Sequence, residues 1–332
     1  MGVRIGINGF GRIGRLVLRA GIDDPDLEFA AINDITDAKT LAYLFKYDSI
    51  HGVFKGTVKV NEKGFEVNGR QINIYAERDP ANIPWDKHKV DIVVESTGLF
   101  RKREQAGKHI KGSVKKVLIS APAKGHDGTF VQGVNFDQYD ASKHNIISIG
   151  SCTTNCLAPV VKVLHDKFKI SKAFMTTIHA YTNDQMILDF PHSDLRRARA
   201  AALSMIPTTT GAAKAISEVI PEMKGKIDGV AVRVPTPDGS LVDLVAELEK
   251  DVTVETVNAA MRAAAGGPMK GVLEYVDEPI VSIDVVGNPH SSVFDAQSTM
   301  VLGNRMVKVF SWYDNEWGFS CRMVEMLKMM MG

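Results

Sequence analysis

One cysteine lies where the sequence could activate a thiol. Cys152 follows the apolar run 145–149 and precedes the helical pattern of residues 157–168, and Ser151 before it is a suitable helix N-cap. The positive end of a helix dipole stabilises a thiolate, so we expect the pKa of Cys152 to be lowered. A thiolate is a nucleophile that can attack a carbonyl carbon. A buried structural cysteine is the competing interpretation, and it is the one expected for Cys156, one helical turn further on.

A thiolate nucleophile works with a base, and nine histidines are available. Only His179 ends a strongly apolar run, residues 174–178, and leads into a polar loop at 181–185. This place favours His179 as the partner of Cys152, with a purely structural histidine as the alternative. The cysteines and histidines show none of the spacings typical of metal ligands, so no metal is predicted.

Residues 9–14 read Gly-Phe-Gly-Arg-Ile-Gly and match the G-x-G-x-x-G pattern of dinucleotide-binding folds. The pattern follows an apolar run at 3–8 and opens a helical stretch, and Asp34 lies about 20 residues after Gly14. The first glycine allows the tight turn, the second lets the backbone approach a pyrophosphate, and the third lets the helix pack on the strand. The Asp34 carboxylate would bind a ribose 2′-hydroxyl and repel a 2′-phosphate, which favours NAD over NADP. A helix cap is the alternative role for Asp34.

A reactive thiol combined with a nicotinamide dinucleotide indicates aldehyde oxidation. Addition of the thiolate to an aldehyde creates a carbon that can release a hydride, and its oxidation leaves a thioester. A basic, hydroxyl-rich stretch that contains Arg197 and Thr210, together with Arg233, could bind phosphate groups. An ordinary solvated charge cluster is the alternative.

The elements that must position these residues fall into two halves. In the first half, short apolar runs alternate with helical stretches, which predicts an α/β fold with a Rossmann-type doubly wound sheet. Residues 58–74 differ, because turn signals at 61–64 and 68–69 predict hairpins there. Beyond about residue 151 the predicted strands are longer and partly alternate between polar and apolar residues. This pattern predicts an α+β catalytic domain with a mostly antiparallel sheet.

Length and composition limit the class of protein. The chain has 332 residues, enough for about two domains. Lys and Arg number 40 against 39 Asp and Glu, and this balance argues against nucleic acid as a partner. No apolar run approaches the roughly 20 residues that cross a bilayer, so no membrane association is expected. Three cysteines, an odd number, indicate a reducing, cytoplasmic compartment rather than a disulfide framework.

The motifs closely resemble those of the phosphorylating glyceraldehyde-3-phosphate dehydrogenases. The resemblance covers nearly the whole chain and is carried, in the family's order, by residues 7–15, 96–98, 120–125, 151–156, 179–185, 210–214 and 312–316. It implies oxidative phosphorylation of glyceraldehyde 3-phosphate to 1,3-bisphosphoglycerate with NAD, through a thiohemiacetal and a thioester, in glycolysis or gluconeogenesis.

The resemblance also implies a role for each matching residue. Cys152 would be the nucleophile, and His179 the base that activates it and later acts as general acid. The residues that would hold NAD are Gly9, Gly11, Arg12, Ile13, Gly14, Asp34, Arg78, Thr97, Ser120 and Asn315. The residues that would bind the substrate and the two phosphates are Ser151, Thr153, Thr182, Arg197, Thr210, Gly211 and Arg233.

Domain organisation and assembly follow from the same resemblance. It implies an NAD-binding domain over residues 1–151, joined by a C-terminal helix over 317–332, and a catalytic domain over 152–316. Members of this family are homotetramers in which the loop around residues 181–205 reaches a neighbouring subunit's cofactor. Pro191 matches the residue of members that use NAD, in agreement with Asp34.

Several positions depart from the usual pattern of the family, among them Ile149, Gly150, Ser193, Ser204 and Phe319. Gly150 adjoins the nucleophile, so it is expected to loosen that loop. Ser204 also occurs in the related erythrose-4-phosphate dehydrogenases, which makes that activity an alternative. Retention of residues 182–185, which resemble the inorganic-phosphate site, favours the glyceraldehyde enzyme. A protein that binds NAD without catalysing a reaction is a second alternative.

Overall fold

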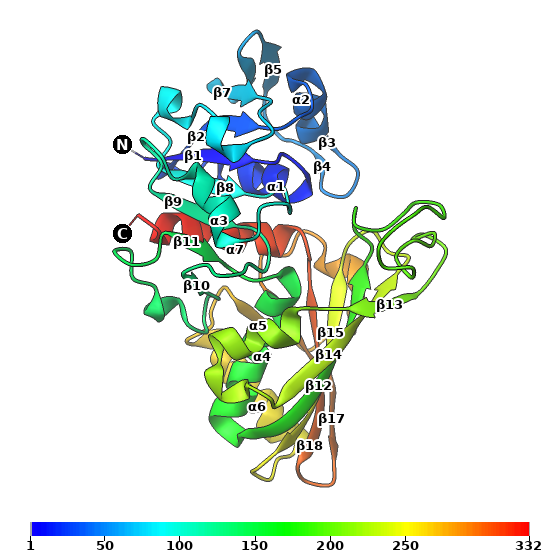
Figure 1. The fold of residues 1–332 in the computed structure, drawn as a ribbon. Coiled ribbons are helices and arrows are strands. Elements are labelled where there is room, and N and C mark those ends of the chain that lie inside the picture. Colours follow the sequence, from blue (N-terminus) through cyan, green and yellow to red (C-terminus); the bar gives the residue numbers. More distant parts are fainter. Residues whose placement is uncertain (1, 332) are drawn as a thin grey trace. The chain divides into compact units, whose positions relative to one another are not determined.

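A computed structural model describes residues 2–331 of the chain. The chain forms two compact units (Figure 1). Unit 1 comprises Met1–Phe130, Gln138–Gly150 and Ser320–Gly332, and unit 2 comprises Val131–Asp137 and Ser151–Phe319. Within residues 2–331, none of the helices combines the length and the apolar character that a membrane span requires.

Unit 1 is built on a nine-stranded sheet in the order β10-β11-β9-β8-β1-β2-β7-β6-β5. The strands are β1 (Val3–Asn8), β2 (Leu27–Asn33), β5 (Val58–Asn61), β6 (Gly64–Val67), β7 (Arg70–Tyr75), β8 (Ile92–Glu95), β9 (Lys116–Ile119), β10 (Gly128–Thr129) and β11 (Ile146–Ser148). All neighbours from β10 to β7 pair in parallel. Such strands are covered on both faces, and Ile92, Val93 and Val94 are accordingly fully buried. The predicted doubly wound sheet is confirmed.

The strand order reverses direction at β1. The chain passes from β1 through α1 (Arg12–Gly21) to β2 on one side, and later returns to place β8 on the other side of β1. The C-terminal ends of β1, β2 and β8 therefore surround a topological switch point, where open α/β sheets bind ligands. The other helical segments of this region are α2 (Ala38–Lys46), α3 (Arg103–Ala106) and short 3₁₀ turns at Pro80–Asn82, Trp85–His88 and Gly107–His109.

The predicted hairpins are also present. Strand β5 pairs antiparallel with β6, and β6 with β7. Asn68 (φ 51°) and Gly69 (φ 77°) form the turn between β6 and β7, with the two positive φ angles that a tight hairpin turn needs. A separate two-stranded sheet joins β3 (Tyr47–Asp48) to β4 (Gly52–Val53).

The C-terminal helix α7 (Trp317–Met329) begins at the predicted residue and ends three residues before the predicted limit. Just beyond the helix, Met331 N donates to Lys328 O, a hydrogen bond across three residues instead of four. Such a tighter turn is common where an α-helix ends. The ammonium group of Lys328 binds the carboxylate of Asp24 within unit 1. Gly332 lies outside the described residues.

Unit 2 is built on a seven-stranded sheet in the order β13-β14-β12-β15-β18-β17-β16. The strands are β12 (Ile170–Ala180), β13 (Ile206–Thr209), β14 (Ile227–Val234), β15 (Ser240–Leu248), β16 (Leu273–Val276), β17 (Ser292–Leu302) and β18 (Met306–Tyr313). Four of its neighbouring pairs are antiparallel, whereas β12–β14 and β16–β17 are parallel. The prediction of a mostly antiparallel sheet is thus confirmed.

Helices α4 (Cys152–Phe168), α5 (Ala212–Val219) and α6 (Val254–Gly266) share one hydrophobic core with this sheet. On β12 the residues alternate: Ala173 and Met175 face this core, while Phe174 between them is 72% exposed. Val230 on β14 and Met300 on β17 are more than half exposed as well. The opposite face of the sheet is therefore partly apolar and open.

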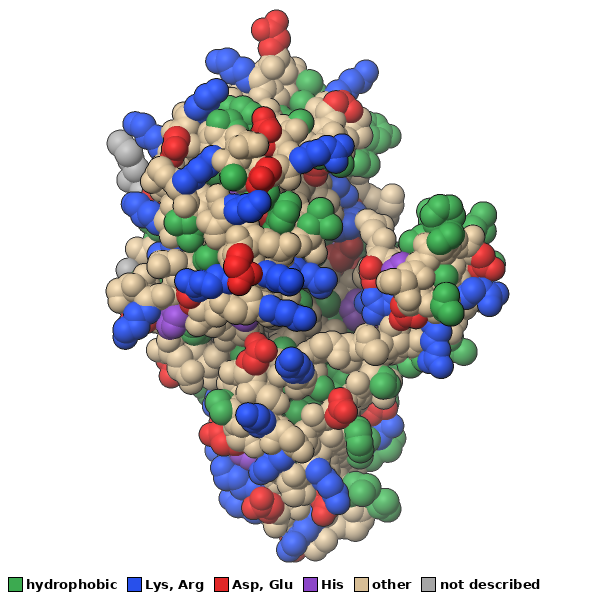
Figure 2. Space-filling model, viewed as in Figure 1, with side chains coloured by type: hydrophobic (Ala, Val, Ile, Leu, Met, Phe, Trp, Pro, Cys, Tyr) green, Lys and Arg blue, Asp and Glu red, His purple; other side chains and the backbone are tan. Residues whose placement is uncertain are grey.

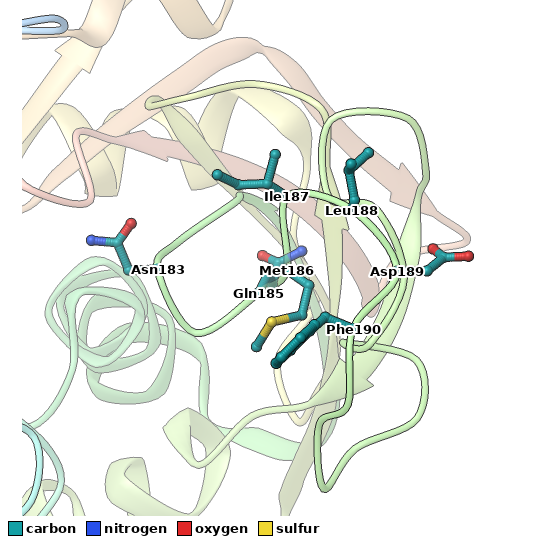
Figure 3. A pocket seen from close by; sticks show the side chains of 7 residues that line it. All are labelled: Asn183, Gln185, Met186, Ile187, Leu188, Asp189 and Phe190. Carbon is teal, nitrogen blue, oxygen red and sulfur yellow. The ribbon is translucent and has the colours of Figure 1, made fainter.

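A long loop, residues 181–205, connects β12 to β13. Its side chains line a pocket of about 550 Å³, which Figure 3 shows from close by. Ile187 (85%), Leu188 (71%) and Phe190 (66%) are largely exposed there. Figure 2 shows hydrophobic side chains gathered at this protruding part of unit 2.

Candidate active site

The predicted nucleophile lies at the start of a helix. Ser151 is the N-cap of α4, in an extended backbone conformation, and its side chain accepts a hydrogen bond from the backbone N–H of Thr154. Cys152 is the first residue of the helix and is partly exposed. Cys156, one turn later, is fully buried, as expected of a structural thiol.

The sulfur of Cys152 lies 3.4 Å from Nε2 of His179. His179 is near the end of β12 and only 4% exposed. Its Nδ1 lies 2.7 Å from the backbone carbonyl of Ala180 and 3.0 Å from NH1 of Arg233, and when a neutral ring carries its proton on Nδ1, this N–H donates to the carbonyl. Nε2 then carries the lone pair that faces the thiol. The predicted pairing of a thiol with a base is geometrically present.

The prediction of a lowered thiol pKa is wrong. Burial raises the pKa of Cys152 to about 11, although the charge of Arg233 and the backbone N–H of Thr153 act in the opposite direction. Burial, with the Arg233 charge, lowers the pKa of His179 to about 3. Desolvation of the thiol is the largest of these effects. The resting pair is therefore a neutral thiol beside a neutral imidazole.

Arg233 brings positive charge to this pair. Strands β12 and β14 are parallel neighbours with His179 opposite Arg233, which places the guanidinium beside the ring. Its NH1 donates to Ala180 O at 3.0 Å and to the hydroxyl of Thr182 at 3.5 Å. Its Nε is buried without a hydrogen-bond partner among residues 2–331. An unsatisfied cationic donor next to a nucleophile fits an anionic ligand.

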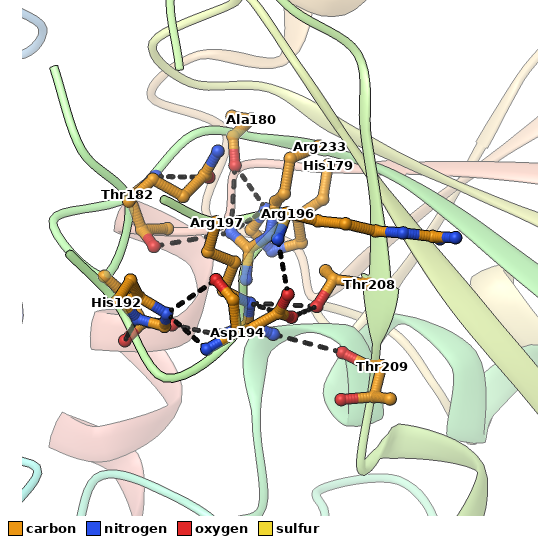
Figure 4. Close-up of polar contacts among 12 residues, drawn as sticks. His179, Ala180, Thr182, His192, Asp194, Arg196, Arg197, Thr208, Thr209 and Arg233 are labelled. Carbon is orange, nitrogen blue, oxygen red and sulfur yellow. Dashed lines mark hydrogen bonds and ion pairs between the residues drawn. The ribbon is translucent and has the colours of Figure 1, made fainter. Parts of the chain in front are cut away.

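A second cationic centre is Arg197, on the loop after β12 (Figure 4). Its guanidinium contacts the carboxylates of Asp184 and Asp194, and its Nε donates to the hydroxyl of Thr208 at 2.9 Å. Thr208 is on β13, the edge strand of the sheet. Part of the Arg197 charge is thus neutralised within the loop.

Thr210 and Gly211 lie at the start of α5. Gly211 is the N-cap, and the hydroxyl of Thr210 accepts a hydrogen bond from the N–H of Ala212. Thr153 differs from the other predicted substrate residues, because its side chain turns into the interior and bonds the hydroxyl of Tyr313 at 2.9 Å. The hydroxyl of Thr153 is thus partly engaged by Tyr313.

Sequence reasoning missed two residues that support the pair. The Tyr313 hydroxyl also bonds Thr177 on β12, and its ring meets the ring of His179 edge to face at 5.9 Å. Ser240 receives a hydrogen bond from Ala180 N and donates one to the side chain of Asn315, which fixes the rotamer of that amide. The sequence did offer a signal for both residues, because Ser240 begins and Tyr313 ends an apolar strand, and Tyr313 is two residues before the candidate residue Asn315.

The dinucleotide motif of unit 1 borders a groove of about 320 Å³ at the switch point. Of the residues predicted to hold NAD, it is lined by Gly9, Gly11, Asp34, Arg78 and Thr97. Arg12 and Ile13 occupy the first turn of α1, which begins beside the groove, and Ser120 follows β9. Asn315 belongs to unit 2.

The glycines have the geometry that such a motif requires. Gly9 has φ 90°, which favours glycine. A Cβ on Gly14 would lie 2.3 Å from the carbonyl oxygen of Gly9, whereas a Cβ on Gly11 would have nothing within 4 Å. Gly14 is thus needed for packing, and Gly11 leaves open space where a pyrophosphate could approach the backbone.

Asp34 follows β2 and holds two loop segments. One carboxylate oxygen accepts a hydrogen bond from the N–H of Phe10 at 2.8 Å, and the other from Thr36 at 3.0 Å. Helix α2 is capped by Asp37 instead, so the alternative role of Asp34 as its cap is wrong. The N-terminus of α1, the open space at Gly11 and the Asp34 carboxylate in the same groove fit an NAD molecule.

Gly150, which departs from the family pattern, has a defined conformation. Its φ is 76°, and its N–H donates to the hydroxyl of Ser148 at 2.9 Å. The residue thus serves a left-handed turn. The structure gives no reason for Ser193 or Ser204, while Phe319 is buried.

Comparisons with known proteins agree with this site. A family model described as glyceraldehyde 3-phosphate dehydrogenase, NAD binding domain, matches residues 3–103, and one described as the C-terminal domain of that enzyme matches residues 151–315. The glyceraldehyde-3-phosphate dehydrogenase of Geobacillus stearothermophilus is 62% identical over 98% of this chain and 97% of its own length. Glyceraldehyde-3-phosphate dehydrogenase 1 of Bacillus subtilis is 59% identical over 98% and 97%. The chain therefore belongs to the glyceraldehyde-3-phosphate dehydrogenase family and is an NAD-dependent oxidoreductase.

Proposed function

We propose that the chain oxidises glyceraldehyde 3-phosphate to 1,3-bisphosphoglycerate, with Cys152 as nucleophile and His179 as base. The observation that carries the proposal is the 3.4 Å contact between the Cys152 sulfur and Nε2 of His179, with Arg233 beside both. The substrate is the one that the names of the relatives give. Inorganic phosphate is the second substrate.

The reaction begins with a proton transfer. Nε2 of His179 takes the thiol proton while the sulfur adds to the aldehyde carbon, and the resulting alkoxide takes the proton back to give a thiohemiacetal on Cys152. His179 then removes the hydroxyl proton as the same carbon loses a hydride, which leaves a thioester and an imidazolium. Bound NAD supplies the hydride acceptor.

The second half of the reaction releases the product. His179 loses its proton to solvent, and a phosphate oxygen attacks the thioester carbon. The C–S bond breaks, the sulfur leaves and takes up the proton of the phosphate, and the acyl phosphate departs. The thiol and the imidazole are then back in their neutral resting forms.

Two groups of residues are suited to the phosphate groups. Arg233 and Thr182 lie beside the nucleophile, and the buried Nε of Arg233 lacks a partner among residues 2–331. Arg197 lies with Thr208, and Thr210 and Gly211 begin α5, where backbone N–H groups point away from the helix. We assign the phosphate of the substrate and the inorganic phosphate to these two groups of residues, without deciding which phosphate each group binds. Ser151 and the backbone of Thr153 lie close to the reacting carbon in this proposal.

The same proposal includes assembly and organisation. The open sheet face with Phe174 and the exposed apolar side chains of Ile187, Leu188 and Phe190 are suited to contacts between copies of the chain in a homotetramer. Residues 1–151 with the helix 317–332 form the NAD-binding domain and residues 152–316 the catalytic domain. Within residues 2–331 no disulfide joins the three cysteines, which supports a cytoplasmic place of action.

The test is to measure NADH formation from glyceraldehyde 3-phosphate with and without inorganic phosphate. Turnover that requires both NAD and phosphate is the expected result. Turnover without phosphate would show hydrolysis instead, and a preference for erythrose 4-phosphate would identify the alternative substrate. Sedimentation equilibrium at micromolar concentration is expected to give four chain masses, and a monomer would contradict the proposed assembly.

A further inference from the structure

Buried polar side chains form a continuous network behind the dinucleotide groove, and none of the roles described above uses it. The network consists of Asn8, Asn33, Trp85, Glu95 and His109, all within unit 1 and none more than 4% exposed. We call it the groove-floor network. Asn8 and Asn33 line the groove, whereas the other three members lie beneath its lining.

The indole of Trp85 determines where the protons of His109 lie. Its Nε1–H can only donate, and it donates to Nδ1 of His109 at 3.2 Å. Nδ1 is therefore an acceptor, and the proton of the ring is on Nε2. This N–H donates to Oε2 of Glu95 at 2.9 Å.

Glu95 accepts hydrogen bonds on both carboxylate oxygens. Oε2 receives the side-chain amide of Asn8 at 2.6 Å in addition to His109, and Oε1 receives the backbone N–H and the hydroxyl of Thr97 at 3.0 and 2.5 Å. Four donors thus surround one buried carboxyl group, whose burial is costly unless it is fully hydrogen-bonded. All four hydrogen bonds to the Glu95 carboxyl group are present, and two of them come from Thr97.

One branch of the network reaches the wall of the groove that follows β8. The Thr97 hydroxyl accepts the N–H of Leu99 at 3.1 Å, and Ser96 next to it donates to the carbonyl of Gly9 at 2.6 Å. Ser96, Thr97 and Leu99 all line the groove. The Glu95 carboxylate thus holds this turn in place.

The other branch reaches the wall that follows β7. Asn8 Oδ1 accepts the amide of Asn33 at 2.8 Å, and Asn33 exchanges two hydrogen bonds of 2.8 Å with the backbone of Glu77. Glu77 and its neighbour Arg78 line the opposite side of the groove. A single set of buried hydrogen bonds therefore connects both walls.

We propose that the Glu95–His109 pair is a positioning unit for the adenosine half of NAD. It keeps the turns at 96–99 and 77–78 at the separation the cofactor needs, and so it acts on cofactor affinity and not on the chemistry at Cys152. The adenosine half is the relevant one because the groove contains Asp34, the residue placed for the ribose 2′-hydroxyl. The inference rests on NAD binding by unit 1 and goes beyond the proposed reaction.

The first test is the Glu95→Gln variant, whose amide offers one acceptor oxygen and turns its NH₂ towards donors. Calorimetric titration is expected to show dissociation constants for NAD and for ADP-ribose that are both raised about tenfold, the effect of losing one to two buried hydrogen bonds. At saturating NAD, kcat is expected to stay within about twofold of the wild type, since Glu95 does not touch the reacting atoms. Unchanged affinity for ADP-ribose, or a loss of kcat with unchanged affinity, would overturn the inference.

The second test compares two substitutions at one position and does not depend on Glu95→Gln folding. His109→Gln keeps a donor for Glu95 and an acceptor for Trp85, whereas His109→Leu removes both. The glutamine is expected to retain affinity for ADP-ribose within about threefold and the leucine to lose about tenfold or more. Equal affinities for the two variants would show that the position only fills space.

A matched control separates positioning from general destabilisation. Tyr139→Phe removes a half-buried hydroxyl that binds Lys116, at the opposite end of the parallel sheet from the groove. It is expected to lower the thermal midpoint while leaving the affinity for ADP-ribose unchanged. An equal loss of affinity in this control would contradict the inference. The affinities for NAD and ADP-ribose are measured by binding alone, so they remain decisive even if the aldehyde substrate proposed above proves to be another one.

Discussion

The sulfur of Cys152 lies 3.4 Å from Nε2 of His179, at a point where helix α4 begins and strand β12 ends. The neighbouring strand β14 places Arg233 opposite His179 and adds a positive charge. Burial keeps the pair neutral in the resting protein, with the proton on sulfur. The nucleophile is therefore produced only when His179 takes that proton, so base and nucleophile act in one step.

Removing the base tests this coupling. In His179→Asn, no group remains at 3.4 Å to take the thiol proton, and kcat is expected to fall by about 10²- to 10⁴-fold. The KM for NAD is expected to change little, because the cofactor groove belongs to unit 1. Cys152→Ser is the matched variant: it should bind NAD and turn over no substrate. Near-normal turnover of His179→Asn would show that another group is the base.

The charge of Arg233 gives a second prediction. This charge lowers the pKa of Cys152, against the larger effect of burial, so its removal in Arg233→Met raises that pKa further. Less thiolate is then present at neutral pH, and alkylation of Cys152 by iodoacetamide is expected to be several-fold slower, at about tenfold per pKa unit. Arg262→Met, which removes an exposed arginine on α6, should leave the rate unchanged. Alkylation that is as fast in Arg233→Met as in the wild type contradicts the arrangement.

Local signals explain why much of the site could be predicted from the sequence. Ser151 is a strong N-cap, so the start of α4 and the place of Cys152 follow from neighbouring residues alone. The glycines of residues 9–14 are likewise needed for the local connection of one strand through one turn to one helix, so their roles could be predicted from this short stretch of sequence. Asp34 could be placed because its distance from Gly14 along the chain reflects a single βαβ unit.

The features that could not be predicted depend on contacts between distant segments. The raised pKa of Cys152 comes from desolvation by the assembled core, which no pattern around residue 152 records. The register of β12 against β14 brings Arg233 to His179, and the long strand β18 brings Tyr313 to Thr153. His109 lies in a 3₁₀ turn without any recognisable motif, yet it is part of the groove-floor network.

The dinucleotide glycines give opposite outcomes for one and the same substitution. Gly14→Ala forces a Cβ to within 2.3 Å of Gly9 O, so this variant is expected to be destabilised by about 2 kcal/mol or more. Gly11→Ala has free space and should unfold like the wild type, but its methyl group occupies the approach of the pyrophosphate. Calorimetry is expected to show at least tenfold weaker NAD binding for Gly11→Ala. Full affinity there would mean that the pyrophosphate lies elsewhere.

Asp34 is expected to determine the choice between NAD and NADP. In Asp34→Ser the carboxylate that repels a 2′-phosphate is gone, and so is the acceptor for the N–H of Phe10. The specificity constant for NAD is therefore expected to fall about tenfold or more, while that for NADP stays equal or rises. Steady-state kinetics with both cofactors measure the ratio. A ratio equal to that of the wild type would show that Asp34 does not face the ribose.

A buried ion pair next to the groove gives unit 1 a defined dependence on pH. Asp48 accepts a hydrogen bond of 2.6 Å from Arg12, together with the N–H groups of Ile50 and His51. These contacts outweigh burial and lower the pKa of Asp48 from 3.8 to about 2. The folded-state pKa is depressed, so the stabilisation is complete above pH 3.8 and is lost as the pH falls through about 2.

Asp48→Asn measures this contribution, because asparagine keeps an acceptor for Ile50 and His51 and loses the charge that binds Arg12. At neutral pH its free energy of unfolding, from urea titration, is expected to be lower by about 1–2 kcal/mol, a value reduced for partial solvent screening. The difference from the wild type should narrow between about pH 4 and pH 2 as Asp48 becomes protonated in the wild-type protein. Glu28→Gln, which breaks a half-exposed pair with Arg4 in the same unit, should change stability by less than about 0.5 kcal/mol. A difference for Asp48→Asn that does not change with pH would mean that shape, and not the ionised pair, stabilises this end of α1.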